Sequence, residues 1–495
     1  MIRLLFILLF LGNYLNSLAQ DIEIGETIDT SHKDYNAQFY REFIKDEGGY
    51  LYSGVFYNSN YKSDKDKGAS YIEKFDKNLN IVKAKKIESP NMNVSRMLAF
   101  FAQKNQFYAI NLEQEQSENN LYLYQIDKNT LEATKKELVL SANKIYKFQR
   151  YNHCKVVVSK DRKSVAAFAF SREKNKLGLT AVMYDQNLNR TWETTTILPF
   201  KAVNNGSYRF KEVYMDKSQE NTYLIIENEE QQEYVLCSFI KKTNKVTYEK
   251  IARKQSGTEY IQSISISKIN EQVKWLMFTS KKWSKNVDKL KIVDVDTKEK
   301  TLIEIGQKMI NNGEEYLYKG DLYSLAFKNI FTYPDGSIII TSEHTGTYQK
   351  GKYVYNTRCG YIYTICIDKN SKVLWENTIY KSQDVNTYGE ILISFASMKD
   401  SKGNIHIFFV HGINDLTLLS SKAEFIKTMG ITHKVINREG DIEDGKYIPR
   451  DKNIKEFPPL FVAKNTSNID KDEYILVEWS RKNTQRMIKL KLTEE

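Results

Sequence analysis

Phe75-Asp76-Lys77-Asn78 is a tetrapeptide that returns along the chain in closely similar form. Its other copies are Ile126-Asp127-Lys128-Asn129, Tyr184-Asp185-Gln186-Asn187 and Ile367-Asp368-Lys369-Asn370. Each copy follows a short apolar stretch and precedes a stretch with the pattern of a β-strand. Asp and Asn are typical of tight turns, because their side chains accept hydrogen bonds from nearby backbone N–H groups. Self-similarity at roughly fifty residues indicates a repeat architecture.

Eight units can be aligned along the sequence, each built on a plan of four β-like segments, A to D in chain order, of which the last unit contains three within its own range. They cover about residues 36–87, 97–138, 153–196, 209–251, 260–304, 325–379, 391–448 and 458–492. A small sheet with two apolar faces cannot bury both faces alone, whereas stacking such sheets around an axis buries them all. The units therefore predict an all-β fold, a single β-propeller with eight four-stranded blades, and seven blades is the alternative count.

The two ends of the chain are expected to close the ring. The last unit offers only three strand-like segments, about 458–464, 473–479 and 485–492, whereas an extra alternating stretch, Asp21–Ile28, precedes the first unit. We expect this N-terminal strand to supply the missing fourth strand of the last blade. Pairing of the two termini would remove exposed sheet edges.

One phrase of the sixth unit resembles a known blade motif. Cys366-Ile367-Asp368-Lys369-Asn370-Ser371-Lys372-Val373-Leu374-Trp375-Glu376 is similar to the blades of quinoprotein-type and WD40-like propellers. The resemblance covers the C–D turn of several units. Trp192 and Trp375 occupy matching positions, but the other units carry Lys, Tyr or Thr nearby. The resemblance implies a propeller and singles out no specific family.

The amino terminus predicts the cellular compartment. Met1–Leu11 reads MIRLLFILLFL, and Ser17-Leu18-Ala19 places small residues where a signal peptidase cuts. The apolar run ends near Leu11, well short of the roughly 20 residues that a membrane span needs. We interpret residues 1–19 as a signal peptide and 20–495 as the propeller domain. The expected protein is exported, periplasmic or extracellular, and has no transmembrane segment.

The composition and charge of the chain limit the classes of partner that it is expected to bind. The chain of 495 residues has a formal charge of +11, with Lys interspersed among Asp and Glu. Nucleic-acid binding requires clustered basic residues and a reading element, so no nucleic-acid partner is predicted. The 33 Tyr and 24 Phe of the chain are residue types that are enriched in β-strands.

The cysteines are interpreted as buried. Cys359 and Cys366 are seven residues apart on one expected strand, so they should point to opposite faces. They are Cys154, Cys237, Cys359 and Cys366.

Candidate chemistry is sparse. Glu343-His344 ends the second strand of the sixth unit, and a Glu–His pair transfers protons only when both groups reach a substrate. Adjacent strand residues point to opposite faces, which disfavours that role. The six His show no metal-ligand spacing, and His406 and His411 are interpreted as ordinary strand-end residues. We predict no catalytic residue, metal or cofactor.

Loop lengths indicate where a ligand binds. In a propeller the A–B and C–D turns share one face (the short-turn face), and the B–C and D–A connections share the other (the loop face). Here the second set is long and varied, and variable loops on a rigid scaffold usually carry binding. The predicted ligand-binding residues are Tyr316, Tyr318, Tyr323, His344, Tyr348, Tyr353, Tyr355 and Tyr388.

The predicted function is binding or scaffolding of a protein or an extracellular polymer on the loop face. One alternative is a carbohydrate-active or quinone-cofactor enzyme with its site at the central channel. Another is a component of cell-envelope assembly. Three or more carboxylates converging at the channel mouth would favour an enzyme.

Overall fold

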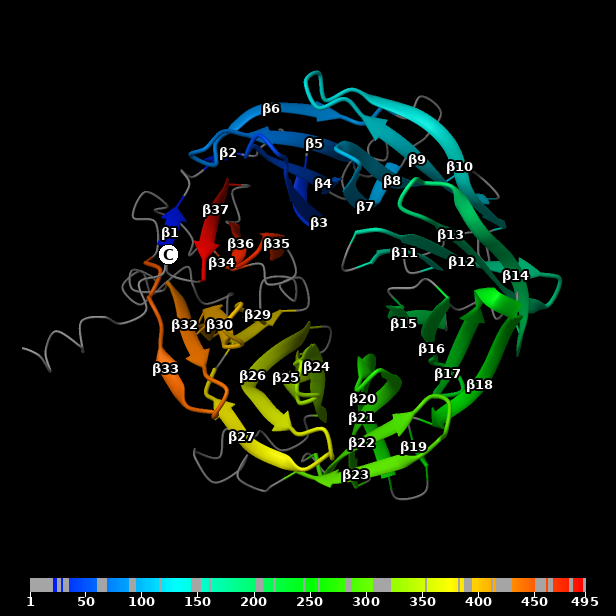
Figure 1. The fold of residues 1–495 in the computed structure, drawn as a ribbon, viewed down its shortest axis with the longest axis vertical. Coiled ribbons are helices and arrows are strands. Elements are labelled where there is room, and N and C mark those ends of the chain that lie inside the picture. The colour runs from blue at the N-terminus through cyan, green and yellow to red at the C-terminus, as the bar shows by residue number, and fades with distance from the viewer. Residues whose placement is uncertain are drawn as a thin grey trace, which may run out of the picture.

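The chain forms a ring of eight antiparallel sheets around a central axis (Figure 1). The computed structural model describes residues 21–24, 28–29, 35–59, 69–88, 95–114, 118–143, 153–159, 162–201, 208–216, 220–243, 245–253, 255–256, 259–281, 287–305, 322–351, 354–381, 383–386, 394–410, 413–414, 430–449, 460–461, 466–479 and 484–492. Strand A of each blade lies nearest the axis and strand D lies at the rim. The predicted propeller with eight blades is confirmed.

The first four blades follow one plan, with neighbouring strands in chain order. Blade 1 contains β3 (Tyr35–Lys45), β4 (Leu51–Ser59), β5 (Ala69–Phe75) and β6 (Ile81–Lys86). Blade 2 contains β7 (Ser95–Gln103), β8 (Gln106–Gln114), β9 (Glu118–Ile126) and β10 (Ala133–Asn143). Blade 3 contains β11 (Cys154–Val158), β12 (Val165–Glu173), β13 (Lys176–Tyr184) and β14 (Arg190–Lys201). Blade 4 contains β15 (Tyr208–Met215), β16 (Asn221–Asn228), β17 (Glu233–Ile240), the 3-10 turn η2 (Lys241–Thr243) and β18 (Lys245–Arg253).

The last four blades carry additional short strands. Blade 5 contains β19 (Gln255–Ser256), β20 (Glu259–Ile269), β21 (Gln272–Lys281), β22 (Lys289–Asp294) and β23 (Lys300–Glu304). Blade 6 contains β24 (Leu322–Thr332), β25 (Ile338–Gly351), β26 (Val354–Ile367), β27 (Val373–Ile379) and β28 (Gln383–Asn386), with β31 (Ile413–Asn414) beside β28. Blade 7 contains β29 (Phe395–Lys399), β30 (Ile405–Val410), β32 (Ile431–Ile436) and β33 (Ile442–Asp444). Blade 8 contains β34 (Leu460–Phe461), β35 (Ser467–Asp470), β36 (Glu473–Trp479), β37 (Thr484–Lys491), β1 (Asp21–Ile24) and β2 (Ile28–Asp29).

The repeated aspartates build the short C–D turns. Oδ1 of Asp76 accepts the N–H groups of Asn78 and Asn80, both at 2.9 Å. Leu79, two positions before the first residue of β6, then takes a positive φ of 64°. Asp185 and Asp368 likewise accept the N–H groups two and four residues on. Asp127, and Asp294 at a turn that the repeated tetrapeptide does not mark, accept those two and three residues on.

The apolar core lies between the blades rather than within them. Blades 3 and 4 meet through one buried cluster in which Phe170 of β12 stacks on Phe210 of β15, with ring centroids 4.1 Å apart. Blades 5 and 6 meet in the same way through Phe278 and Phe327. Each sheet therefore supplies an apolar face to both of its neighbours, which is why the repeat folds as a ring.

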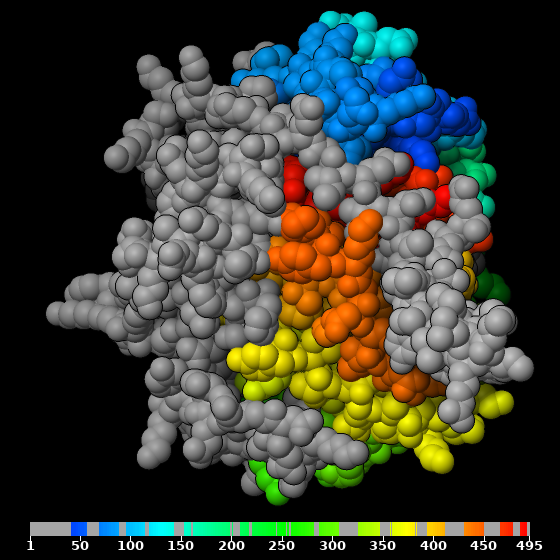
Figure 2. Space-filling view, turned by 90° about the vertical axis from the view of Figure 1, so that its left-hand side faces the viewer, coloured from blue at the N-terminus to red at the C-terminus, as the bar shows by residue number. Residues whose placement is uncertain are grey.

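The N-terminal strand closes the ring as predicted. β1 pairs antiparallel with β37, with Asp21 opposite Lys491 and Ile24 opposite Ile488, and β2 continues along the same edge. Blade 8 then packs on blade 1 through a cluster that includes Phe43 and Val477. Blades 1, 8, 7 and 6 follow one another along one side of the molecule in blue, red, orange and yellow (Figure 2).

All four cysteines are buried and free. The expectation that Cys359 and Cys366 point to opposite faces is wrong. β26 is bulged between Cys359 and Ile362, because Thr345 and Glu343 of β25, two residues apart, pair with residues three apart. The additional residue reverses the alternation of side chains between the two faces of the sheet. Cys359 therefore lies beside Glu343 on the blade 7 side, where Cys366 also packs.

Within the described residues, no helix is long and apolar enough to span a bilayer.

Candidate functional site

Among the described strands, those of blade 6 extend furthest toward the loop face. β25 and β26 have 14 residues each, whereas the described B and C strands of the other blades have at most ten. Four additional residues lengthen the hairpin by about 14 Å at about 3.4 Å per residue. β28 pairs with β26 from Asn356 to Cys359, and β31 lies parallel to β28. We call the loop-face ends of β25 and β26, together with β28, the blade 6 extension.

A buried polar network anchors the base of this extension. Glu343 of β25 is fully buried and forms an ion pair with Lys381, which is also fully buried. Its second oxygen, Oε2, lies 2.8 Å from Nζ of Lys328 and accepts the hydroxyl of Ser394 at 2.7 Å. Burial alone would raise the pKa of Glu343, but the two ammonium groups outweigh it and lower the pKa to about 2. Glu343 is therefore a permanent carboxylate.

The network also joins blade 6 to blade 7. Oε1 of Gln383 accepts Nζ of Lys381 at 2.8 Å and the backbone N–H of Ser394 at 2.9 Å. Its amide nitrogen donates to the carbonyl of Val410 at 2.8 Å. Ser394 has a φ of 125°, a conformation that residues other than glycine rarely adopt and that persists only where surrounding contacts enforce it. Its bonds to Gln383 and Glu343 are such contacts. We call Lys328, Glu343, Lys381, Gln383 and Ser394 the buried network.

The opposite side of the same blade, toward blade 5, carries an aromatic row. His344 lies opposite the buried Leu325 of the blade 5–6 core. Tyr361 follows on β26, and the ring of Tyr380 lies 5.4 Å from the ring of Tyr361, tilted by 59°. Tyr380 is 53% exposed. Among the described residues, a Cβ atom added at Gly360 would contact His344 alone, at an ordinary van der Waals distance of 3.7 Å. We call His344, Gly360, Tyr361 and Tyr380 the shelf.

The shelf is uncharged at neutral pH. Burial lowers the pKa of His344 to about 4, although the neighbouring carboxylate of Glu343 acts in the opposite direction. That carboxylate points to the other side of β25 and is neutralised within the buried network. The Glu343-His344 pair is thus divided between two faces, as the strand pattern predicts.

The structure describes part of the predicted ligand-binding set. Tyr316, Tyr318, Tyr353 and Tyr388 lie outside the described residues. The backbones of Tyr323, Tyr348 and Tyr355 belong to β24, β25 and β26, on the loop-face half of blade 6. His344 is the one predicted residue whose side chain is described.

Sequence reasoning missed Tyr361, Tyr380 and all of the buried network except Glu343. The pairing of Ile362 with Ile379 shows that Tyr361 and Tyr380 are the next residues of two paired strands. Counting outward from the Asp368 turn would have found this juxtaposition. The bulge beside Gly360 leaves no such sequence signal.

A second buried polar chain lies in blade 7, at its short-turn end. Nε2 of His406 lies 3.1 Å from Oδ2 of Asp400, and its Nδ1 lies 3.1 Å from Nε2 of His433. Burial, and then the electrostatic interaction with His406, lower the pKa of His433 to about 3. All three side chains are buried, so the chain serves packing rather than contact with a ligand. Among the described residues, no three His, Cys, Asp or Glu gather as a metal site would require.

No family model and no curated protein matches this chain. Among solved structures, an oligogalacturonate lyase in complex with manganese is 11% identical over 97% of this chain and 98% of its own, with a TM-score of 0.36. A putative 6-phosphogluconolactonase from Bacteroides uniformis is 10% identical over 82% and 97%, with a TM-score of 0.37. An α-L-arabinanase from Penicillium chrysogenum, complexed with arabinobiose, is 10% identical over 66% and 94%, with a TM-score of 0.33. The fold assignment rests on the strand pairing described above.

Proposed function

We propose that this chain is an exported binding or scaffold protein that holds a protein or an extracellular polymer on the loop face of its propeller. The observation that carries the proposal is the blade 6 extension with its buried network. A projecting sheet costs little to order on binding when its base is already fixed, and this preorganisation favours affinity. The strained φ of Ser394 and the buried Lys381 are the structural means of fixing it.

The chemistry of the extension favours binding over turnover. Among the described side chains at the base of the extension, Glu343 is a carboxylate with a strongly lowered pKa, but it is buried and paired with two lysines. It is therefore placed to hold the sheet rather than to reach a substrate. The neutral shelf on the opposite side offers aromatic surface, which is enriched where proteins recognise ligands.

Export is consistent with ring closure. Cleavage after Ala19 would leave Gln20 at the new amino terminus, and β1 starts at Asp21. The proposed processing thus spares every residue that pairs with β37. Blade 8 remains complete in the processed chain.

Shortening the hairpin tests the binding face. Thr347 and Thr357 are directly paired, so replacing residues 348–356 by Asn-Gly gives a two-residue hairpin turn of the favoured type. The purified protein and this variant are used as baits against cell-envelope and culture-medium fractions. We expect one stoichiometric partner with the intact protein and its loss with the variant. A Tyr248→Ala variant, altered at the rim of blade 4, is the control and should retain the partner. Turnover of a polysaccharide by the intact protein, or equal capture by the short hairpin, would refute the proposal.

A further inference from the structure

We propose that the shelf binds the sugar rings of a neutral polysaccharide. This inference rests on the proposed function and specifies its ligand. Of the three ring-bearing residues, His344 lies on β25, Tyr361 lies on the neighbouring strand β26, and Tyr380 directly follows the last residue of β27, Ile379. Neighbouring strands are about 4.8 Å apart, so the row spans about 10 Å. That length accommodates two linked sugar rings.

The shape of the shelf suits flat rings. Gly360 presents no side chain beside His344, where an added Cβ atom would make ordinary van der Waals contact at 3.7 Å, and the bulge of β26 brings Gly360 and Tyr361 to the same side of the blade. Tyr380 is 53% exposed and its ring is tilted against that of Tyr361. Tyrosine presents an apolar ring body together with a polar hydroxyl. A sugar ring likewise has an apolar C–H face surrounded by hydroxyl groups, so the two surfaces are complementary.

The charge of the shelf selects a neutral polymer. None of its four residues carries a charge above the lowered pKa of His344, about 4. An acidic polysaccharide would find no cation on the shelf, because Lys328 and Lys381 are engaged with Glu343 on the other side of the blade.

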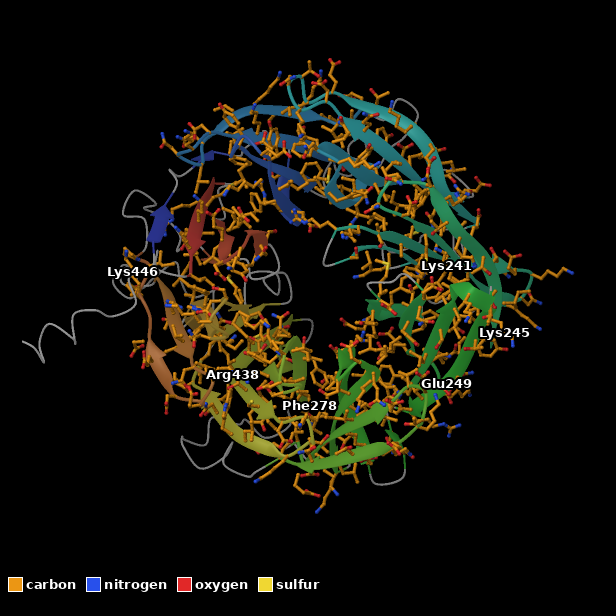
Figure 3. All side chains as sticks on the ribbon, viewed as in Figure 1. Lys241, Lys245, Glu249, Phe278, Arg438 and Lys446 are labelled. Atoms are coloured by element: carbon orange, nitrogen blue, oxygen red, sulfur yellow. The ribbon has the colours of Figure 1, made fainter. Side chains whose placement is uncertain are left out.

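The shelf stands on a rigid base. Beneath it, Tyr363, Phe278 and Phe327 belong to the core between blades 5 and 6, and Phe278 stacks on Phe327 with centroids 4.3 Å apart. Phe278 marks this junction in Figure 3. On the other side of the blade, the buried network holds β25, the strand that carries His344, through Glu343. Aromatic groups held in place in the free protein lose little freedom on binding.

The test measures binding of the purified protein to a β-glucan, a xylan and an arabinan, with polygalacturonate as the acidic comparison, by affinity electrophoresis and calorimetry. We expect at least one neutral polymer to bind and polygalacturonate to bind less tightly. Tyr380→Ala and Tyr361→Ala should each weaken binding about three- to tenfold, the loss of one stacked ring. Tyr380→Phe keeps the ring and should stay within about twofold of the wild type.

Tyr248→Ala is the matched control, because Tyr248 is 45% exposed on β18 of blade 4, away from the shelf. It should bind like the wild type. Circular dichroism and thermal unfolding verify that each variant is folded. Because Tyr380 is more exposed than Tyr361, we expect Tyr380→Ala to disturb folding less than Tyr361→Ala. Unchanged binding by both alanine variants overturns the inference, as does a preference for polygalacturonate.

The failures of the two proposals are distinguishable. If the short-hairpin variant loses a captured partner while Tyr380→Ala keeps it, the loop face binds but the shelf does not, and only this inference falls. If Tyr380→Ala loses a protein partner that no polysaccharide displaces, the shelf is a protein site and the saccharide assignment falls. If the intact protein retains neither a polymer nor a partner, both proposals fall.

Discussion

At the scale of single residues, the ring contains charged pairs where its blades meet. Three arginine or lysine side chains are buried against buried glutamates. They are Arg41 with Glu73, Lys381 with Glu343 and Arg486 with Glu478. Such pairs add little net stability, because desolvation offsets their attraction. Removing one partner, however, leaves the other charge buried without a counter-charge. Their effect is therefore largest when they are broken.

Glu343→Gln should be strongly destabilising. The substitution leaves the buried ammonium of Lys381 without its counter-charge, and a loss of about 3–5 kcal/mol in the free energy of unfolding follows. Chemical denaturation measures this loss. Glu304→Gln is the control, because Glu304 pairs with Lys289 while 74% of its side chain is exposed, and it should change stability by less than about 1 kcal/mol. Equal effects of the two substitutions would contradict the assigned role of Glu343.

The free energy of unfolding should decrease as the pH falls, and protonation of His433 should account for part of that decrease. Burial lowers the pKa of this imidazole from 6.5 to about 3 in the folded protein. The unfolded chain therefore takes up the proton first as the pH falls below 6.5, and stability is lost by up to about 1.4 kcal/mol per pH unit. We expect the free energy of unfolding of His433→Gln to depend on pH less steeply than that of the wild type between pH 6.5 and 4. Identical slopes would show that His433 does not contribute.

At the scale of elements, turns were predictable and interfaces were not. Asp76 and its relatives determine their own turns by hydrogen bonds within five residues, so short sequence patterns suffice to find them. The number of blades follows from aligning eight units of strand-like segments in phase with such turns, and the closing strand follows from the missing fourth segment of the last unit. Ser394 and Glu343, by contrast, meet across 51 positions, and the bulge beside Gly360 depends on how β25 and β26 pair. Such contacts depend on packing, which no local pattern records.

Removing the closing strand should weaken the ring. Deletion of residues 21–29 leaves the outer edge of β37 unpaired along six residue pairs. In an antiparallel ladder every second pair exchanges two hydrogen bonds, so losing about six bonds at about 1 kcal/mol net each should cost up to about 6 kcal/mol. Thermal unfolding and limited proteolysis measure the effect. A synthetic peptide of residues 20–30 should restore stability in trans, whereas a scrambled peptide should not. An unchanged melting temperature after the deletion would exclude this role for β1.

At the scale of the whole molecule, charged side chains lie on the exposed outer strands of the ring, whereas the cysteine thiols are buried inside it. The outermost strands leave one edge of each sheet open, and charged side chains protect such edges from pairing with other molecules. β18 exposes Lys245, Lys250 and Arg253 in this way, and Lys245 lies at the rim in Figure 3. The four cysteines, in contrast, are all buried. The proposed export would bring this chain into an oxidising compartment, so the accessibility of its thiols has consequences.

The folded protein should keep all four thiols reduced without protection. Burial raises the pKa of Cys154, Cys237 and Cys359 to about 12 and that of Cys366 to about 11, so the reactive thiolate is scarce at neutral pH. We expect Ellman's reagent to label none of them in the native protein and all four after unfolding in denaturant. Protein recovered from the exported fraction should begin at Gln20 and have the intact mass of a chain with four free thiols. A mass lower by two hydrogens would reveal a disulfide. It would require Cys359 or another thiol to leave its site, and would contradict the packing that places Cys359 beside Glu343 at the base of the blade 6 extension.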